Sequence, residues 1–315
     1  MVDSKIKLAI VGVGKIVKDQ HHPSIIKNPD YELVATASRN GFLDGIESFK
    51  SIESLLANRK DLDAVSLCMP PQYRFTAAKF ALEHGVDVLL EKPPGATVCE
   101  VNQLEKLAVM NDCQLYTTWH SRHAPAVANA KRFLSQPQLK IEEVLINWKE
   151  DVRKWHPNQE WIWQAGGLGV FDPGINGLSI LTHILPASFF VETSILKFPE
   201  NRAAPIAANL SFTSEDGYRI IGEFDWGISG GEEWNIEVIT DQGKLILSSG
   251  GAKLAIDGEP QEVEQYSEHG EYESIYREFS SLVSNRKSNV DVSPLALVAD
   301  AFLLGERIIL ESFDE

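Results

Sequence analysis

The sequence predicts an α/β protein: a doubly wound parallel sheet, followed by an α+β region with a mostly antiparallel, open sheet. Three observations support this. Short apolar runs alternate with helix-like segments through about residue 120. These runs are nearly continuous, as in strands whose two faces are both covered by helices. Beyond residue 121, strand-like runs follow one another with turns between them, which is typical of antiparallel sheets.

The first part of the chain contains five expected strands and four expected helices. The strands are Lys7–Val13, Glu32–Ala37, Ala64–Met69, Val86–Leu90 and Gln114–Trp119. The helices are Ile16–Lys27, Ile52–Asn58, Arg74–Glu83 and Val98–Asn111. In the third helix, Phe75, Ala78 and Leu82 recur at helical spacing and form one apolar face. We expect these elements to form a first domain over residues 1–121.

The second part begins with an expected helix, Ala124–Leu134. The expected strands are Glu142–Trp148, Ser194–Lys197, Ala207–Phe212, Tyr218–Phe224, Trp234–Thr240 and Lys244–Leu247. Turn sequences such as Glu215-Asp216-Gly217 separate them, and helices are expected near Pro173–Leu185 and Leu295–Glu311. We expect a second domain over residues 122–315, whose last helix, about 295–311, is free to pack back on the first domain.

Charge and composition narrow the function classes. A net charge of −16 over 315 residues argues against nucleic acid and against an anionic membrane surface as partners. The three cysteines lack metal-ligand spacing, so we expect free thiols and no metal site. The N-terminus lacks the features of a signal peptide, and no apolar stretch is long enough to cross a membrane. We therefore expect a cytoplasmic protein.

A glycine turn after the first strand indicates a Rossmann-like dinucleotide site. Gly12 and Gly14 fit the first two positions of the dinucleotide fingerprint, but Val17 stands where glycine or alanine is usual. A purely structural glycine turn is the alternative. The second strand ends without a carboxylate for a ribose hydroxyl. Ser38 and Arg39 suit a 2′-phosphate instead, so NADP is preferred and NAD use is not excluded. Arg39 as a solvated loop residue is the competing interpretation.

The fourth strand ends in Glu91-Lys92-Pro93-Pro94, at the edge where parallel sheets bind their ligands. The two prolines stiffen the backbone after Lys92, which argues against an ordinary surface lysine. A cation held there stabilises negative charge that develops on a substrate oxygen. His120 follows the fifth strand and is a candidate for the same site.

A tryptophan-rich stretch suggests a sugar site. Four of the seven tryptophans lie within residues 148–163, together with Glu150 and His156. Aromatic faces stack on sugar C–H groups while polar side chains bind the hydroxyls. We expect at least two of these tryptophans, including Trp148, to be core residues.

Asp172 and Asn176 follow the tryptophan-rich stretch. They are four residues apart and therefore share a helix face. Asp172 before Pro173 also fits a purely structural role, as the N-cap of a helix that begins at the proline.

Gly12-Val13-Gly14, Glu91–Pro94 and the stretch from Gly166 to Asn176 resemble the Gfo/Idh/MocA oxidoreductase family. Within it the chain is most similar to bacterial aldose 1-dehydrogenases that oxidise L-arabinose and D-galactose. This closer resemblance rests on four strings: Lys15-Ile16 with Asp19–His21, Trp119–Arg122, Trp148–Arg153 and Phe171–Asn176.

The resemblance implies a set of site residues. It implies that Lys92, Asp172 and Asn176 surround the reacting carbon. It implies sugar contacts from His120, Glu150, Trp155 and His156. The implied cofactor-binding residues are Gly12, Gly14, Lys15, Ile16, Ser38, Arg39, Glu91 and Lys92. Many family members have histidine at the position of Asn176, and asparagine cannot act as an acid or base. Asp172 is then the expected proton acceptor.

The resulting expectation is an NAD(P)-dependent aldose 1-dehydrogenase that oxidises C1 of L-arabinose, D-galactose or D-fucose to the lactone. The alternative within the family is oxidation of a secondary alcohol of another sugar or of inositol. A sugar or dinucleotide sensor without catalysis is a third hypothesis. We expect a homo-oligomer, a dimer or tetramer, formed through the C-terminal sheet.

Overall fold

The computed structural model describes residues 5–157, 159–263, 267 and 269–314. The chain divides into two compact units. The first unit comprises residues 1–120 and 266–292, and the second comprises residues 121–265 and 293–315. The expected boundary near residue 121 lies next to the first of these divisions. The expected continuous second domain over 122–315 differs from the structure, because residues 266–292 belong to the first unit.

The first unit is built on a parallel sheet of six strands within the described residues, in the order β3-β2-β1-β4-β5-β6. The strands are β1 (Ile6–Val11), β2 (Tyr31–Ala37), β3 (Glu47–Phe49), β4 (Ala64–Leu67), β5 (Asp87–Leu90) and β6 (Leu115–Thr117). The order reverses between β1 and β4, so the carboxyl ends of these two strands flank the point where doubly wound sheets bind ligands.

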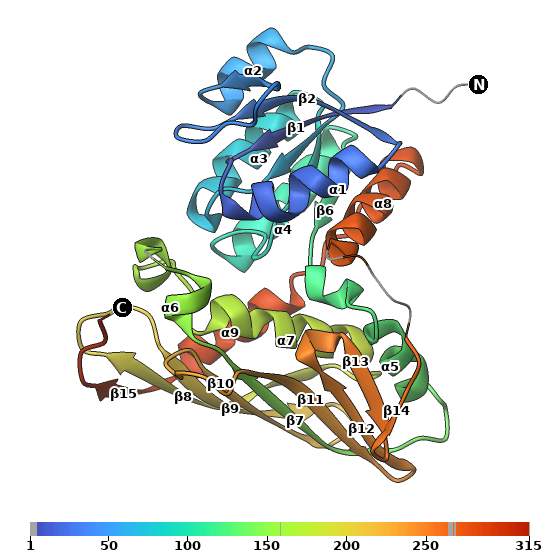
Figure 1. Cartoon of the computed structure of the whole chain (residues 1–315), viewed down its shortest axis with the longest axis vertical. Coiled ribbons are helices and arrows are strands. Elements are labelled where there is room, and N and C mark those ends of the chain that lie inside the picture. The colour runs from blue at the N-terminus through green and yellow to red at the C-terminus, as the bar shows by residue number, and fades with distance from the viewer. Residues whose placement is uncertain (1–4, 158, 264–266, 268, 315) are drawn as a thin grey trace. The chain divides into compact units, whose positions relative to one another are not determined.

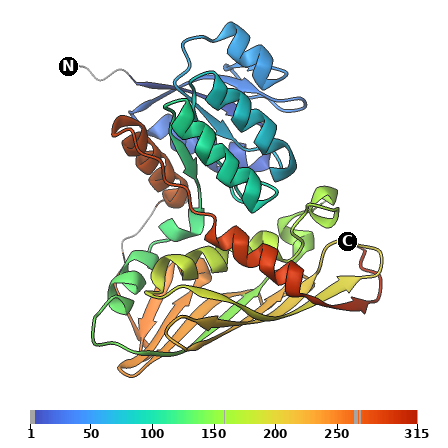
Figure 2. The same ribbon diagram turned by 180° about the vertical axis from the view of Figure 1, so that it is seen from behind.

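Helices cover both faces of this sheet, as the expected doubly wound fold requires. One face packs on α2 (Ile52–Asn58), α3 (Arg74–Glu83) and α4 (Val98–Met110), which lie in front of the sheet in Figure 2. The other face packs on α1 (His22–Lys27) and α8 (Gly270–Ser284), which are in front in Figure 1. The C-terminal half of the chain thus supplies α8 to the N-terminal sheet.

The expected helix Ile16–Lys27 is divided in two. A π-helical turn, η1 (Val17–His21), precedes α1, and the His22 amide donates to the Val17 carbonyl five residues back. Pro23 has no amide hydrogen to continue the regular ladder, which accounts for the wider turn. Val17 itself is buried in the core with α1 and α8, so the irregular third position of the glycine motif supplies a core side chain.

The second unit is built on a mostly antiparallel sheet of nine strands within the described residues, in the order β14-β13-β12-β11-β7-β10-β9-β8-β15. The strands are β7 (Ile141–Lys149), β8 (Phe189–Pro199), β9 (Ala207–Ser214), β10 (Arg219–Asp225), β11 (Glu233–Thr240), β12 (Gly243–Ser248), β13 (Lys253–Ile256), β14 (Glu259–Pro260) and β15 (Glu306–Leu310). The β7–β10 and β8–β15 pairs are parallel. This arrangement confirms the predicted fold class.

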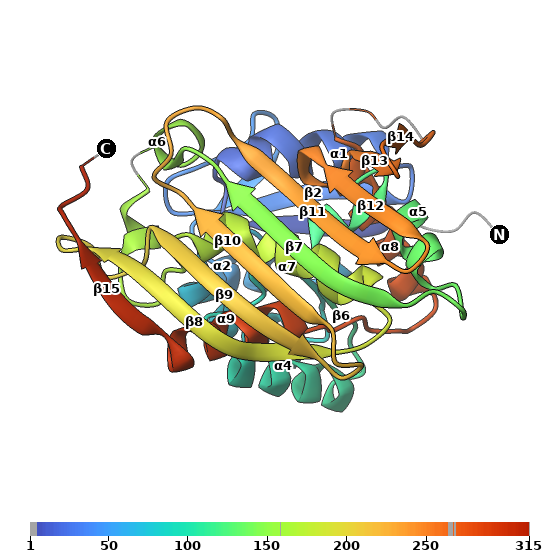
Figure 3. The same ribbon diagram turned by 90° about the horizontal axis from the view of Figure 1, so that it is seen from below.

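One face of the second sheet carries helices, and the face seen in Figure 3 is open in the part of the chain that is described. The helices are α5 (Val127–Leu134), α7 (Phe171–Ile184) and α9 (Ser293–Leu304). The short helix α6 (Val152–Trp155) follows β7. Along β7, Val144, Ile146 and Trp148 are buried while Leu145 and Asn147 between them are half-buried. This alternation is typical of a sheet with one covered face.

The expected C-terminal helix at about 295–311 is wrong beyond residue 304. α9 ends at Leu304, and after Gly305 the chain forms β15 along β8. The helix also belongs to the second unit, where it contacts α7 and β8. Two isoleucines and a leucine, Ile308–Leu310, follow the glycine, and such residues suit a strand better than a helix that has just passed a glycine.

Candidate active site

The glycine turn after β1 has the geometry of a dinucleotide cradle. Gly12 has a φ of +90°, and a Cβ there would lie 2.6 Å from the Met69 backbone nitrogen. A Cβ on Gly14 would meet no atom within 4 Å. Only glycine fits at position 12, while Gly14 leaves its backbone accessible, as a pyrophosphate requires. Lys15 and Ile16, also predicted at this site, are exposed, and Lys15 pairs with Asp19.

The carboxyl end of β2 carries the two residues predicted to bind a 2′-phosphate. Ser38 is half-buried and its hydroxyl accepts from the Gly41 amide at 3.3 Å, while Arg39 is exposed. The Lys50 ammonium donates to the Arg39 carbonyl at 3.4 Å, so two cations lie at this strand end. A hydroxyl and two cations fit an anionic group better than a bare ribose hydroxyl.

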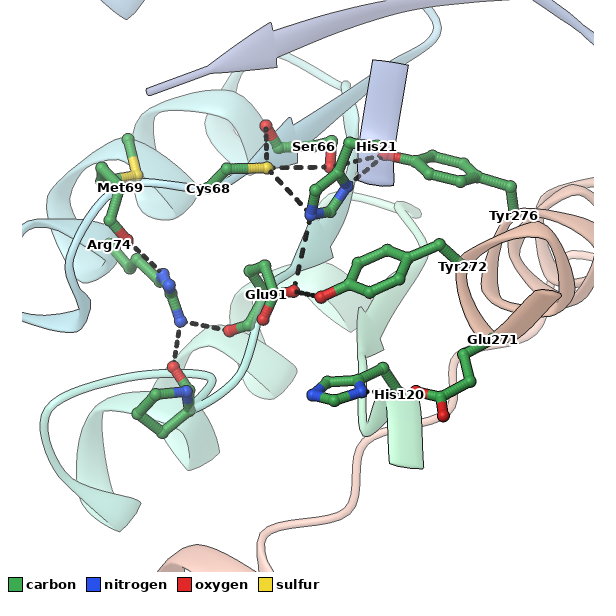
Figure 4. Close-up of polar contacts among 11 residues, drawn as sticks. His21, Ser66, Cys68, Met69, Arg74, Glu91, His120, Glu271, Tyr272 and Tyr276 are labelled. Atoms are coloured by element: carbon green, nitrogen blue, oxygen red, sulfur yellow. Dashed lines mark hydrogen bonds and ion pairs between the residues drawn. The ribbon is translucent and has the colours of Figure 1, made fainter. Parts of the chain in front are cut away.

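Glu91, at the end of β5, is the centre of a buried polar network (Figure 4). The Tyr272 hydroxyl donates to its Oε1 at 2.5 Å, and His21 Nε2 lies 3.5 Å from the same oxygen. Among the described residues, its other oxygen, Oε2, has no hydrogen-bond partner. Arg74 donates to the backbone carbonyls of Glu91 and Pro93. These contacts fix the turn that carries Lys92, which is half-buried and is followed by a cis peptide bond to Pro93.

The network holds opposite charges on His21 and Glu91. Burial alone would raise the Glu91 pKa, but the hydrogen bond and charge of His21 outweigh it and hold the pKa at about 2. Burial alone would lower the His21 pKa, but the Cys68 sulfur, 3.6 Å from Nε2, and Glu91 raise it to about 10. A buried carboxylate is therefore paired with a buried imidazolium beneath the Lys92 turn.

The second unit gathers four of the predicted site residues, Glu150, Trp155, His156 and Asp172, near one another. His156 Nε2 lies 3.6 Å from Asp172 Oδ2 and 4.0 Å from Glu150 Oε1. Both carboxylates are buried, whereas the imidazole is half-buried. Its Nδ1 is buried and has no hydrogen-bond partner within the described ranges. A titratable ring between two buried carboxylates is an arrangement able to take up and pass on a proton.

Two tryptophans orient Glu150. The Trp226 and Trp234 indole N–H groups donate to its Oε1 and Oε2 at 3.1 and 2.9 Å. Trp155, 44% exposed, packs edge-on against Trp234 with ring centroids 5.8 Å apart. Trp155 thus presents an accessible aromatic surface next to a fixed carboxylate. Trp148 and Trp163 are buried, which confirms that at least two tryptophans of this stretch are core residues.

The helix carrying Asp172 and Asn176 begins earlier than predicted. α7 starts at Phe171, so Asp172 lies in its first turn and is not the N-cap. The amides of Phe171 and Asp172 bond to the carbonyls of Leu168 and Gly169, so the preceding loop already supplies the first turn. Asp172 is buried and Asn176 half-buried.

Lys92 and His120 belong to the first unit, whereas Asp172, Asn176, Glu150, Trp155 and His156 belong to the second. Within the second unit, His156 lies close to both Glu150 and Asp172. That the two groups meet on one substrate stays a prediction. Within the described residues, no group of three or more His, Cys, Asp or Glu side chains is arranged to hold a metal ion.

Sequence reasoning missed five residues of these groups: Arg74, Glu271, Tyr272, Trp226 and Trp234. His21 entered the sequence analysis only as the last residue of the Asp19–His21 string. The signal for Tyr272 lies in α8, where Tyr272, Ile275, Tyr276 and Phe279 follow helical spacing. Arg74 and Trp226 carry no local signal, because their partners are distant in sequence.

Residues 6–119 match the family described as "Oxidoreductase family, NAD-binding Rossmann fold" (GFO_IDH_MocA). Galactose 1-dehydrogenase of Pseudomonas fluorescens is 44% identical over 312 residues, 98% of each chain. The crystal structure of D-galactose-1-dehydrogenase from Rhizobium etli superposes with a TM-score of 0.94 at 56% identity, covering 100% of this chain and 99% of that one.

The chain belongs to the Gfo/Idh/MocA oxidoreductase family. A 3-ketoreductase from Actinomadura kijaniata has the same fold: it is 20% identical, with a TM-score of 0.82 over 98% of this chain and 100% of its own. As expected, the first unit is the NAD-binding Rossmann part of a family oxidoreductase. In the portion of the chain that is described, no helix is long and apolar enough to cross a membrane.

Proposed function

We propose that this protein is an NAD(P)-dependent sugar dehydrogenase that oxidises C1 of a pyranose aldose to the lactone, with D-galactose, L-arabinose and D-fucose as substrates. The observation that carries the proposal is the Glu150–His156–Asp172 cluster beside exposed Trp155. Support also comes from near-full-length similarity to two proteins named as galactose 1-dehydrogenases.

Oxidation of the C1–OH group removes a proton from O1 and a hydride from C1, leaving the carbonyl of the lactone. In our proposal Asp172 accepts the O1 proton. His156, whose Nε2 lies 3.6 Å from Asp172 Oδ2, then takes that proton from Asp172. Lys92 and Asn176 orient O1 and stabilise the negative charge that develops on it.

The fit to the cofactor rests on the glycine turn and on the end of β2. Gly12 and Gly14 would hold the pyrophosphate, and Ser38 and Arg39 would hold the 2′-phosphate of NADP. Glu91 and Lys92 would lie at the end of a strand beside the nicotinamide. When bound, a nicotinamide dinucleotide accepts the hydride that leaves C1. Lys15 and Ile16 complete the proposed set.

The proposed substrates share a pattern of hydroxyl groups. L-arabinopyranose matches D-galactose at C2 to C4 and lacks only the C6 group. A site that hydrogen-bonds the shared hydroxyls rejects a wrong hydroxyl more strongly than it rejects a missing carbon group. His120, Glu150, Trp155 and His156 are the proposed readers of that pattern.

We also propose a homo-oligomer formed through the open face of the second sheet. Leu145 and other half-buried side chains line this face, and Ile309 on the edge strand β15 is 64% exposed. Light scattering coupled to size exclusion measures the mass in solution. A monomeric mass would contradict this part of the proposal.

The activity is tested by incubating the protein with NADP and each sugar while following absorbance of the reduced cofactor. Product analysis then separates C1 oxidation from oxidation of a secondary alcohol, since only the lactone hydrolyses to an acid. The proposal fails if galactose, arabinose and fucose all give no turnover, or if the product is a keto-aldose, in which a secondary alcohol has been oxidised.

The role of Asp172 is tested with Asp172→Asn. We expect kcat to fall about 10³-fold, the order contributed by a positioned general base, while the Kd for NADP stays within about twofold. Asp216→Asn is the matched control, because Asp216 is an exposed hairpin residue of the same unit. Unchanged kcat in Asp172→Asn would remove Asp172 as the proton acceptor.

A further inference from the structure

Two side chains from the first turn of α8, those of Glu271 and Tyr272, contact His120. The distance between His120 Nδ1 and Glu271 Oε2 is 2.7 Å, and both side chains are largely buried, with 19% and 32% exposed. The His120 ring stacks on the Tyr272 ring at a centroid distance of 5.5 Å and an interplanar angle of 18° (Figure 4). A ring with one nitrogen bound to a carboxylate and one face covered has little freedom to rotate.

Glu271 and Tyr272 from α8 contact His120, and the charges of His120 and of Glu91, at the end of β5, interact. Tyr272 is a neutral phenol, because burial and the charge of Glu91 raise its pKa far above the ordinary value. Its hydroxyl donates to Glu91 and so does not serve His120. Glu91 is in turn paired with His21. Glu271 is the carboxylate that lies within hydrogen-bond distance of His120 Nδ1.

This contact decides which nitrogen of His120 carries the proton. A carboxylate only accepts hydrogen bonds, so Nδ1 of His120 is the donor to Glu271. In the neutral ring Nε2 is then the acceptor. Without the carboxylate the two tautomers would interconvert, and Nε2 would act as a donor part of the time.

We propose that Glu271 is a positioning residue that fixes His120 in the tautomer whose Nε2 accepts a hydrogen bond from a sugar hydroxyl. The role of His120 in sugar binding rests on the proposed function. The assignment of its tautomer rests on the contact with Glu271 in α8. Sugar binding then requires the tautomer with an unprotonated Nε2, so loss of the Glu271 contact raises the KM for the sugar while the Kd for NADP stays unchanged.

The test compares Glu271→Gln with Glu273→Gln in the full chain. Glu273 lies in the same turn of α8 and is similarly exposed at 27%, but it pairs with Lys27 at 3.1 Å and not with His120. The variants lose the same charge from the same helix end. Glutamine keeps the volume of Glu271 but cannot stabilise the imidazolium by charge.

Two readouts are needed. Nitrogen NMR of the histidines, with His120 assigned by its loss in His120→Asn, gives its tautomer without any substrate. Steady-state kinetics and fluorescence titration give the sugar KM and the Kd for NADP. In Glu271→Gln we expect mixed tautomers and a sugar KM about tenfold higher, as for loss of one charge-assisted hydrogen bond. Glu273→Gln is expected to match the wild type.

The inference is overturned if Glu271→Gln leaves the His120 tautomer unchanged. It is also overturned if thermal stability, Kd for NADP and sugar KM all worsen together, which indicates a general structural defect. If the wild type oxidises no aldose, the proposed function and the sugar role of His120 both fail. The NMR result then decides separately whether Glu271 sets the tautomer.

Discussion

His21 and Glu91 are almost fully shielded from solvent, and each depends on the other for its charge. Removing one partner would leave an uncompensated buried charge, which makes the folded state less stable than it is with the intact pair. His21 also contacts Tyr276, whose hydroxyl lies 2.7 Å from Nδ1. A single histidine in the turn after the glycine motif thus connects β4, β5 and α8.

The pairing predicts how stability depends on pH. The pKa of His21 is about 10 in the folded state and 6.5 in the unfolded chain. Between these values the folded protein holds a proton that the unfolded chain releases, so the free energy of unfolding falls with rising pH by about 1.4 kcal/mol per unit. The contribution is complete below pH 6.5 and lost above the folded pKa. Urea unfolding from pH 6.5 to 9.5 measures the slope.

His21→Gln is expected to be less stable at pH 6.5 and to lose most of this alkaline slope. His84→Gln, at an exposed histidine of the same unit, is expected to keep it. If His21→Gln and wild type show the same slope, His21 is not the group that releases the proton.

Arg39 provides the test of cofactor choice. For Arg39→Ala we expect the Kd for NADP to rise about tenfold, because a charge-assisted contact to the 2′-phosphate is lost, and the Kd for NAD to stay within about twofold. Fluorescence titration with both cofactors measures the ratio. Lys60→Ala removes an exposed cation elsewhere in the unit and is the control. Equal weakening of both cofactors in Arg39→Ala would contradict a specific 2′-phosphate contact.

At the residue scale, sequence could identify groups with a local signature. Gly12 and Gly14 follow an apolar strand, and Lys92 precedes two prolines. His156, Glu150 and Asp172 drew attention through neighbouring tryptophans and a helix start. Arg74 has no such signature, and the helical spacing around Tyr272 indicates a buried helix face but no contact with Glu91. Both residues contact Glu91 only when distant segments pack together.

At the element scale, two glycines let α7 lie close to the second sheet. A Cβ on Gly174 would lie 2.7 Å from the Phe224 ring, and one on Gly177 would lie 2.7 Å from Trp148 Cε3. The two positions are three apart and share a helix face. Asp172 lies in the first turn of the same helix, so this close packing also fixes its distance from the sheet.

Gly177→Ala tests this packing. Alanine favours the helix by about 1 kcal/mol, but a 2.7 Å contact with a buried ring forces repacking that costs about 1–3 kcal/mol. We expect a net loss of about 1 kcal/mol in chemical denaturation. Adding Trp148→Phe to Gly177→Ala should restore part of the lost stability. Within the described residues the Trp148 indole N–H has no hydrogen-bond partner, so this second substitution removes no hydrogen bond. Full additivity of the two changes would contradict direct contact.

Element prediction succeeded where the apolar pattern was regular. The helices at Ile52–Asn58 and Arg74–Glu83 were placed at their observed bounds. The C-terminal helix was extended too far, because the apolar residues of α9 are followed, after Gly305–Arg307, by the further apolar residues Ile308–Leu310. Whether such a run becomes helix or strand depended on β8, whose edge accepts β15 in parallel.

At the scale of the whole molecule, the first unit is completed by a segment from far along the chain. Tyr272, Ile275, Tyr276 and Phe279 of α8 are at most 4% exposed and pack with Leu8, Ile10 and other core residues of the parallel sheet. The Tyr31 hydroxyl donates to the Tyr276 carbonyl at 2.8 Å. A division of the sequence at residue 121 therefore leaves one face of the first sheet without its second helix.

This completion predicts how fragments behave. Burial of an apolar or aromatic side chain stabilises by about 1.5–3 kcal/mol, so the four α8 side chains contribute about 6–12 kcal/mol, comparable with the entire stability of a domain. Residues 1–120 alone are expected to give a broad urea transition and to bind the dye ANS. Residues 1–120 joined by a glycine–serine linker to residues 266–292 are expected to unfold cooperatively.

The same fusion carrying Ile275→Asp and Phe279→Asp is the matched control, because its length and linker are unchanged while the α8 face can no longer be buried. It should behave like residues 1–120 alone. A sharp, ANS-free transition of residues 1–120 would show that the sheet reaches its fold without α8. The buried network of His21, Glu91 and Tyr272 would then be added to a finished domain, since Tyr272 comes only with α8.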